Sequence, residues 1–406
     1  MDATSTLQID LDAIAHNVAV LRGLCSPEVR FCAVLKGDGY GLGASAVAPT
    51  LAAAGVSMFA VFSPSEAEAL LPQGVPLLIL MPTRADSFSP PLAAALKQER
   101  LHLVIHDAGQ MQSLEQLGAR LGTTIPVHLK IDTGLHRGGC DPRDAIVLIR
   151  AIQRSTTLAL AGLMTHFAEA ASSEQVTASQ MRQLCSILDS IRPELSGRLI
   201  VHAAGSCGLL RGGDYHADMV RVGLGWTGHL TSRGEHLRDH LPEPLRPAVT
   251  WRSQIALVRT IAAGERVGYG GRWTADRPTR LGVIPVGYGD GYPHDAGHPA
   301  DGGPGLAIGL PEAGPGETVP VIGSVNMDQV VVDLTDAPGA MEAGSPVELI
   351  STNPGSPSLL ENLSRRLQRP PHALLVQVQS QVIREYTRAV SDPASPAITV
   401  AQVAAG

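Results

Sequence analysis

Eight short apolar runs alternate with stretches of helical spacing between residues 30 and 228, and this alternation is the strongest constraint on the fold. Unbroken apolar runs that end in turn residues are typical of strands buried on both faces of a sheet. Eight such strands separated by helices favour a closed parallel α/β barrel of the TIM type over an open sheet. The expected strands are residues 31–35, 58–62, 75–81, 101–106, 125–131, 158–166, 199–202 and 219–224.

Helices are expected between these strands, where Ala and Leu recur at helical spacing. The stretch SPSEAEALL, residues 63–71, begins with an N-cap serine, a proline in the first turn and acids soon after, which indicates a helix start. The predicted helices are residues 44–54, 64–71, 108–117, 144–153 and 174–191.

The pattern changes after about residue 235, where strand-like runs are broken by Gly, Pro and Asp. We therefore expect a barrel domain at residues 1–240 and a mostly antiparallel β domain at residues 241–388. The tail, residues 389–406, is small, polar and proline-containing and is expected to be poorly ordered. In the β domain, strands are expected at residues 255–261, 280–286, 305–310, 319–325, 330–334, 347–350 and 374–382, with one helix at 359–367.

Composition and charge argue against several classes of protein. The net charge is −7, no long basic block is present and aromatic residues make up 3%, so nucleic acid is not an expected partner. There is no run of eighteen apolar residues and no signal-like N-terminus, so no membrane span is expected. Five scattered cysteines fit reduced thiols in a cytoplasmic protein, and the fourteen histidines show no metal-binding spacing.

Lys36 ends the first apolar run and opens the turn GDGYGLG. A partly desolvated lysine loses its proton more readily and becomes a nucleophile toward carbonyl groups. The glycines of the turn allow the backbone to come close to a bound group. Taken alone, the stretch is also compatible with a lysine that merely starts a solvated turn.

Other polar residues follow the apolar runs, which is where a parallel barrel carries its active site. For His106 alone we favour a structural hydrogen bond to a loop. Together the strand-end residues predict an active site at the carboxyl ends of the strands, formed by Lys36, Tyr40, His106, Lys130, Asp132, Arg137, His166, Ser206 and Arg221.

Several motifs resemble those of the alanine racemase family, whose members combine a barrel with a C-terminal β domain and use pyridoxal 5'-phosphate (PLP). The resemblance extends from about residue 6 to 386 and rests in the barrel on AVLKGDGYGLG, KIDTGLHRGG, MTHFA, HAAGSCGLL and RVGLG. It implies that Lys36 binds PLP covalently. It also implies that Arg137 positions the substrate and the phenolic oxygen of the cofactor, supported by Lys130, a residue often carbamylated in the family. The remaining implied cofactor contacts are Tyr40, Ser206, Gly223 and Leu224 at the phosphate, His166 near the ring and Arg221 at the pyridine nitrogen.

Three motifs of the second domain fit the same family: ERVGYGGRW, IPVGYGDGYPH and GSVNMDQVVVDL. Individually, GYGDGYP and NMDQ are also compatible with hairpin turns. The resemblance implies that Tyr269 is the second catalytic base, that Tyr288 lines the substrate entry, and that Met327 and Asp328 lie near the substrate carboxylate. It further implies a homodimer in which Tyr269 reaches Lys36 of the partner subunit.

Racemisation requires a proton to leave one face of a planar carbanion and another to arrive on the opposite face, so two groups are needed. Lysine and tyrosine have reference pKa values of ~10, which makes them a matched pair. An arginine at the ring nitrogen cannot give up its proton. It therefore disfavours a protonated ring, which limits the charge that the ring absorbs, and we expect this to suppress transamination.

The chain departs from the family pattern at Leu42, Gly138, Gly205, Thr227, Asn326 and His372. His372 stands where a tyrosine usually contacts the phosphate and narrows the alanine pocket. One methylene in a tight pocket is worth about 1–3 kcal/mol of discrimination. Alanine is therefore the default substrate, and serine or a larger amino acid in a specialised pathway is the alternative.

Two other classes fit less well. A dinucleotide-binding dehydrogenase is disfavoured because the glycine spacing is GxGxGxG rather than GxGxxG, and no acidic residue ends the run 58–62. A non-catalytic PLP carrier would keep the barrel lysine but lack the β domain, whereas Tyr269 and the NMD segment are both present.

Overall fold

The computed structural model describes residues 4–84, 88–195, 197–298, 304–388 and 400–402. The chain divides into two compact units. The barrel unit comprises Ala15–Trp226 and Arg233–Leu245, and the β unit comprises Met1–Ile14, Thr227–Ser232 and Arg246–Gly406.

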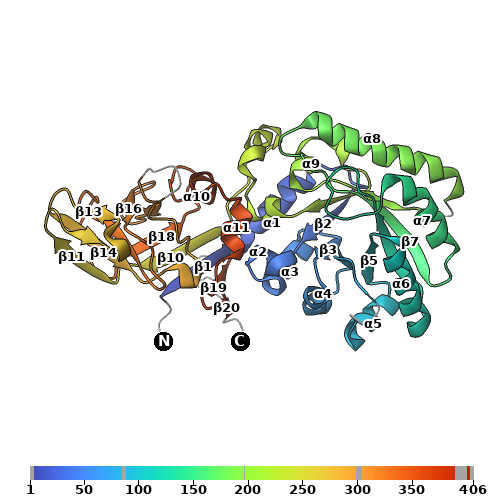
Figure 1. Cartoon of the computed structure of the whole chain (residues 1–406), viewed down its shortest axis with the longest axis horizontal. Coiled ribbons are helices and arrows are strands. Elements are labelled where there is room, and N and C mark those ends of the chain that lie inside the picture. Colours follow the sequence, from blue (N-terminus) through green and yellow to red (C-terminus); the bar gives the residue numbers. More distant parts are fainter. Residues whose placement is uncertain (1–3, 85–87, 196, 299–303, 389–399, 403–406) are drawn as a thin grey trace. The chain divides into compact units, whose positions relative to one another are not determined.

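Eight parallel strands form the barrel, which confirms the predicted fold class (Figure 1). In chain order they are β2 (Arg30–Val34), β3 (Met58–Val61), β4 (Leu77–Ile79), β5 (Leu101–Ile105), β6 (Ile125–Lys130), β7 (Leu158–Met164), β8 (Ile200–His202) and β9 (Met219–Val222). Neighbours in the chain pair from β2 to β8, and β9 pairs with β2. The ring is nearly closed because Asp218 N–H donates to Val201 O at 2.9 Å and Arg221 N–H donates to Ala204 O at 2.8 Å.

Helices surround the barrel strands (Figure 1). Side-chain oxygens of Ser63, Asp107, Asp141 and Ser173 cap α4, α6, α7 and α8, which explains why these helices start where they do. The α-helices are α1 (Leu11–Arg22), α2 (Lys36–Tyr40), α3 (Ala44–Ala53), α4 (Pro64–Leu70), α5 (Pro90–Lys97), α6 (Ala108–Leu121), α7 (Pro142–Arg154), α8 (Glu174–Ile191) and α9 (Ser206–Leu210). The 3₁₀ turns are η1 (Leu71–Gln73), η2 (Arg192–Glu194), η3 (Gly213–Tyr215), η4 (Leu224–Thr227) and η5 (Ser232–His240).

The β unit contains a ten-stranded, mostly antiparallel sheet and a two-stranded ribbon. The sheet order is β11-β14-β17-β16-β15-β18-β10-β1-β19-β20, and β12 pairs with β13. The strands are β1 (Ser5–Asp10), β10 (Val249–Gln254), β11 (Leu257–Ile261), β12 (Arg266–Val267), β13 (Trp273–Thr274), β14 (Thr279–Ile284), β15 (Ala307–Gly309), β16 (Thr318–Ile322), β17 (Val330–Asp333), β18 (Pro346–Ile350), β19 (Ile383–Thr387) and β20 (Val400–Gln402). The remaining elements are η6 (Tyr269–Gly271), η7 (Tyr288–Asp290), α10 (Leu360–Leu367) and α11 (Pro371–Val376).

Two details of the β unit differ from the sequence expectations. The expected strand at 374–382 is wrong, because Pro371 opens the helix α11 and the strand β19 begins only at Ile383. The division at residue 240 also differs, because β1 pairs antiparallel with β10 and parallel with β19 and so belongs to the β unit. Most of the tail 389–406 lies outside the described residues, although β20 within it pairs with β19.

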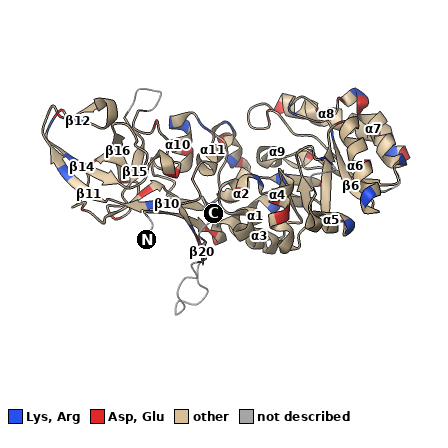
Figure 2. Cartoon of the chain, turned by 60° about the horizontal axis from the view of Figure 1, so that its bottom comes forward, with Lys and Arg blue, Asp and Glu red and all other residues tan. Residues whose placement is uncertain are grey.

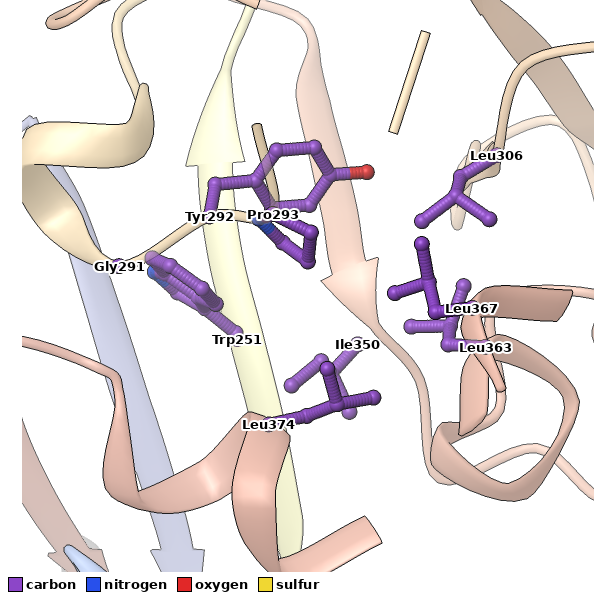
Figure 3. Close-up of a pocket in the computed structure, with 9 residues that line it drawn as sticks. All are labelled: Trp251, Gly291, Tyr292, Pro293, Leu306, Ile350, Leu363, Leu367 and Leu374. Carbon is purple, nitrogen blue, oxygen red and sulfur yellow. The ribbon is translucent and has the colours of Figure 1, made fainter. Parts of the chain in front are cut away.

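A small cavity in the β unit is lined by the buried Trp251 (Figure 3). The indole N–H of Trp251 and the hydroxyl of Tyr292 are buried without a hydrogen-bond partner among the described residues. Apolar side chains from β18, from α10 and α11 and from the residue before β15 enclose this cavity, namely Ile350, Leu363, Leu367, Leu374 and Leu306.

Charged residues of both signs are interspersed over the helices around the barrel (Figure 2). No helix within the described ranges is long and apolar enough to cross a lipid bilayer.

Candidate active site

The lysine turn at the carboxyl end of β2 has an unusual left-handed backbone. Gly37, Asp38, Gly39 and Tyr40 all have positive φ, between 51° and 64°. The turn is fixed by hydrogen bonds from Gly39 N–H to Leu35 O and from Gly41 N–H to Gly37 O, both 2.8 Å. A left-handed residue other than glycine costs roughly 1–2 kcal/mol, so alternate glycines make this turn affordable. Asp38 stabilises it further by accepting from Ala44 N–H at 2.7 Å.

Glu66, which sequence reasoning did not single out, anchors this turn. It is the capping-box acid of α4, with one carboxylate oxygen accepting from the N–H groups of Phe62 and Ser63 at 2.7 and 3.1 Å. Its other oxygen accepts from Gly37 N–H at 2.7 Å. The S-x-x-E pattern signals the cap, but nothing in the local sequence signals the reach to the lysine turn.

Lys36 itself is half-buried. Burial lowers the pKa of its amine, the Arg137 guanidinium lowers it further, and the Glu66 carboxylate partly opposes both. More of the amine is therefore neutral near physiological pH than in an exposed lysine, which favours both nucleophilic attack and proton transfer.

The hydroxyl of Tyr40 packs closely against Gly223. A Cβ added at Gly223 would lie 2.1 Å from the Tyr40 hydroxyl oxygen, so position 223 requires glycine. Ser206 lies beside them, and its Oγ accepts from the N–H groups of Gly225 and Gly223 at 3.1 and 3.3 Å. Since both lone pairs are used, the Ser206 hydrogen is left to donate to an anion. Burial raises the pKa of Tyr40, so the phenol stays protonated and can donate as well.

Arg221 is 4% exposed and lies at the centre of a dense set of acceptors. One terminal nitrogen donates to Thr165 O at 2.7 Å and to Ala203 O at 2.9 Å, and contacts His166 Nδ1 at 3.1 Å. The other donates to His202 Nδ1 at 2.7 Å. Burial lowers the pKa of Arg221 to about 10, which still leaves it protonated at neutral pH.

Cations gather at the carboxyl ends of β6 and β9 and in the loop that carries Arg137. Burial, then Arg137 and Arg221, lower the pKa of Lys130 to about 8 against the attraction of Asp132. Burial and the same two arginines hold the pKa of His166 well below its usual range. These mutual effects place the residues within one electrostatic cluster that also includes Lys36. Such an excess of positive charge favours binding of an anion.

The loop that carries Arg137 is organised by Asp132. One carboxylate oxygen of Asp132 accepts from the N–H groups of Gly134, Leu135 and His136, each at 3.0 Å. Burial acts to raise the pKa of Asp132, but these hydrogen bonds outweigh it and the net shift is downward. The aspartate thus stays ionised and holds the loop closed.

His106 makes the expected hydrogen bond, from Nε2 to Leu80 O at 3.1 Å. It also lies in the site, because its Nδ1 would be 3.0 Å and Lys130 Nζ 3.8 Å from a Cβ added at Gly138. A Cβ at position 138 would press against this imidazole, so the departure at Gly138 is matched by His106.

The remaining site candidates lie in the β unit and are much more exposed. The fractional exposure is 78% for Tyr269, 42% for Tyr288 and 56% for Met327. Hydrogen bonds to backbone carbonyls join their turns, since Gly289 N–H donates to Met327 O at 2.8 Å and Ser324 Oγ donates to Tyr269 O at 3.2 Å. Asp328 belongs to the same group, because its carboxylate lies 3.7 Å from a Cβ added at Gly289.

His372 lies half-buried on α11. The end of α11 reaches the same turn, because Gln377 donates to Gly291 O at 2.8 Å. Within the described residues, no group of three or more His, Cys, Asp or Glu side chains is placed to hold a metal ion.

Comparison with protein families identifies the chain. Residues 9–231 match the model of the alanine racemase N-terminal domain, and residues 248–386 match that of the C-terminal domain. The chain belongs to the alanine racemase family. Both matched regions include site residues described above, Lys36 and Arg221 in the first and Tyr269 in the second.

Related proteins that are named alanine racemase align with nearly the whole chain. The alanine racemase of Chromohalobacter salexigens is 35% identical over 94% of this chain and 97% of its own length. Among solved structures, the alanine racemase from Streptomyces coelicolor is 28% identical, covers 94% of this chain and 98% of its own, and superposes with a TM-score of 0.83. The alanine racemase from Bartonella henselae, solved with covalently bound pyridoxal phosphate, is 26% identical, covers 95% and 99%, and has a TM-score of 0.80.

Proposed function

We propose that this protein is a PLP-dependent racemase that interconverts L- and D-alanine by a two-base mechanism. The observation that carries the proposal is Lys36, a half-buried amine of lowered pKa at the end of a strand. It lies in the same turn as Tyr40, whose hydroxyl, like that of Ser206, can donate to an anion. PLP combines an aldehyde, which a neutral amine attacks, with a phosphate, which hydroxyl donors bind.

The barrel residues fit this cofactor. Lys36 would hold it covalently, and the hydroxyls of Tyr40 and Ser206 with the backbone at Gly223 and Leu224 would bind its phosphate. Arg221 would face the ring nitrogen, with His166 beside the ring. When bound, PLP supplies an electron sink for a carbanion at the substrate Cα.

The side chains of the chain then control the protons. The neutral amine of Lys36 removes or returns a proton at Cα on one face, and the phenol of Tyr269 does so on the other. Arg137 binds the substrate carboxylate. Lys130, once carbamylated, carries a negative charge that supports this arginine, while Met327 and Asp328 line the same end. Arg221 remains protonated, which disfavours a proton on the ring nitrogen and so limits side reactions.

The exposure of Tyr269 supports a homodimer with shared active sites. A general base must be held within hydrogen-bond reach of its proton, and a side chain 78% exposed is not held in that way by its own chain. In the proposed twofold dimer, the Tyr269 turn of each chain would lie against the lysine site of the other. Tyr288 on the same exposed surface would line the entry.

His372 bears on the choice of substrate, and racemisation of serine or a larger amino acid is the second candidate. An imidazole is smaller than a phenol and leaves space where the family has tyrosine. The proposed role is D-alanine supply in the cytoplasm, with a specialised D-amino-acid pathway as the counterpart of the second candidate.

A spectrum, a reductive label and a chiral assay test the proposal together. The protein should be yellow as purified, and borohydride should fix the cofactor on Lys36. The chain contains three lysines, Lys36, Lys97 and Lys130, so mass spectrometry of the peptides gives an unambiguous answer. Label on Lys97 or Lys130 would refute the site. Activity on alanine should exceed that on serine and lysine, and the reverse order would favour the second candidate.

A further inference from the structure

Three histidines form a hydrogen-bonded line through the interior of the barrel and end at Arg221. His102 Nδ1 lies 2.9 Å from His128 Nε2, and His128 Nδ1 lies 2.8 Å from His202 Nε2. His202 Nδ1 in turn lies 2.7 Å from a terminal nitrogen of Arg221. The line starts at the second residue of β5, near the amino-terminal end of that strand, and so approaches Arg221 from the side opposite the proposed active site.

The proton positions along the line follow from Arg221. A guanidinium has donors only, so His202 Nδ1 must be an acceptor and its proton lies on Nε2. His128 Nδ1 then accepts from His202, and His128 carries its own proton on Nε2. The same reasoning places an acceptor at His102 Nδ1. All three imidazoles are therefore neutral and share one tautomer.

A glycine on the strand between β6 and β8 leaves space for one hydrogen bond of this line. β7 lies between β6 and β8, so the bond from His128 to His202 must pass over it. It does so at Gly162, where an added Cβ would lie 2.3 Å from His128 Nδ1. A register shift between Val127 and His128 brings His128 opposite Gly162. A side chain at position 162 would occupy the space of the hydrogen bond.

The surroundings keep the line uncharged. His128 and His202 are fully buried, and apolar side chains such as Val104, Met164 and Ile200 fill the rest of the interior. Burial holds the pKa values of both well below the usual range, and burial and Arg30 lower the pKa of His102 to about 4. Along the line of His102, His128, His202 and Arg221, the positive charge therefore resides on Arg221 and not on a histidine.

We propose that His102, His128 and His202 are positioning residues, a tautomer-locked line that holds the protonated guanidinium of Arg221 in one orientation from inside the barrel. The inference deepens the proposed function, since Arg221 is the residue assigned to the cofactor ring. A change at His102 is transmitted because each imidazole can satisfy its neighbours only in one tautomer. If His128 loses its acceptor, its proton can move to Nδ1. The Nδ1–H of His128 would then point at the Nε2–H of His202, and His202 could relieve this clash only by moving its own proton to Nδ1, where it would point at Arg221.

Nitrogen-15 NMR of histidine-labelled protein tests the line directly. Protonated, N–H and bare imidazole nitrogens have distinct shifts, so the tautomers can be read without substrate or cofactor. We expect all three histidines to be neutral, with the proton on Nε2, from pH 6 to 9. A charged imidazole, or a proton on Nδ1 of His128 or His202 in this range, would overturn the proposal.

Two variants at half-buried His102 test the coupling. His102→Leu removes the terminal acceptor, whereas His102→Asn places an amide oxygen near the position of Nδ1. We expect the leucine variant to shift the nitrogen signals of both His128 and His202, and the asparagine variant to restore them. In the cofactor-loaded enzyme, turnover should fall about two- to thirtyfold in the leucine variant and recover in the asparagine variant.

Unchanged His202 signals in His102→Leu would refute the coupling, as would equal turnover of the two variants. Failure of the proposed function has a different signature, because the protein would then bind no PLP while the tautomer pattern of the unliganded protein remained. The two outcomes are therefore separable in one set of samples.

Discussion

The residues predicted to form the site are held in opposite ways in the barrel unit and in the β unit. In the barrel unit, Arg221 and Tyr40 are at least nine-tenths buried and fixed by contacts of their side chains. In the β unit, Tyr269, Tyr288 and Met327 are exposed, and backbone hydrogen bonds fix their turns rather than their side chains. The predicted site residues of the barrel unit are therefore preorganised, whereas those of the β unit have exposed side chains that their own unit does not fix.

This contrast indicates that the residues of the barrel unit and those of the β unit have different roles. The barrel cluster concentrates positive charge and hydroxyl donors, which is what a phosphate-bearing cofactor requires. The exposed turns carry a phenol, a thioether and a carboxylate, which suit proton transfer and substrate contact. Catalysis by such a pair depends on bringing the two halves together, and the following predictions test each half separately.

The largest effect is expected from Lys36→Ala. Loss of the covalent attachment point and of one base should lower racemase activity by more than about a thousandfold. The far-ultraviolet circular dichroism and the unfolding midpoint should change little, because Lys36 is half-buried and its backbone turn is held by Glu66. Lys97→Ala, at an exposed position, is the matched control. Substantial activity in Lys36→Ala would remove the barrel half from the mechanism.

Tyr269→Phe should have the next largest effect. Removing the phenolic hydroxyl eliminates one of two proton-transfer groups, which is worth about 10²–10⁴-fold in rate. Bound cofactor and stability should be unchanged, since this side chain is 78% exposed. Turnover from the L-amino acid, measured by chiral chromatography, should be most affected. Tyr288→Phe is the control, and equal losses in both variants would argue that the exposed surface acts as a whole.

Glu66→Gln should weaken the preorganisation of the barrel half. An amide cannot accept from the three N–H groups that the Glu66 carboxylate serves, so we expect a loss of about 1–3 kcal/mol in the free energy of unfolding. Glu68→Gln on the same helix affects a single hydrogen bond, from Ser89 Oγ at 2.8 Å, and should cost less. Urea denaturation measures both, and equal costs would show that Gly37 does not depend on Glu66.

The smallest effect is one of pH-dependent reactivity. A lysine reacts with acetic anhydride through its neutral form, so Lys130 labelling should rise with pH and reach half its plateau near pH 8, where its pKa lies. Lys36, whose pKa is also lowered, should likewise plateau at lower pH than an ordinary lysine. Peptide mass spectrometry of the cofactor-free protein checks both, and a Lys130 midpoint near 10 would contradict the cationic cluster.

Much of the fold followed from the sequence because its signals are local. Unbroken apolar runs predicted all eight barrel strands, since a strand buried on both faces needs no polar alternation. The N-cap residue Ser63 marked the start of α4, and the helix expected at residues 174–191 has the same bounds in the structure. The error at residues 374–382 arose because apolar residues after Pro371 suit a short helix as well as a strand.

The features of the site that were not predicted depend on contacts between residues far apart in the sequence. Glu66 meets Gly37 across 29 positions, and His128 meets His202 across 74. Neither partner carries a local signal of the other, and Gly162 looks like any strand glycine until its neighbours are known. The pairing of β1 with β10 and β19 was missed for the same reason.

The central claim is that Lys36 and Tyr269 act on the same Cα from different subunits. Co-expression of Lys36→Ala and Tyr269→Phe chains with different affinity tags allows the mixed dimer to be purified. If sites are shared, one of its two sites contains both mutations and the other contains neither, so about half of the wild-type activity should return. A mixed dimer as inactive as its parents, or a protein that stays monomeric at full activity, would contradict the account.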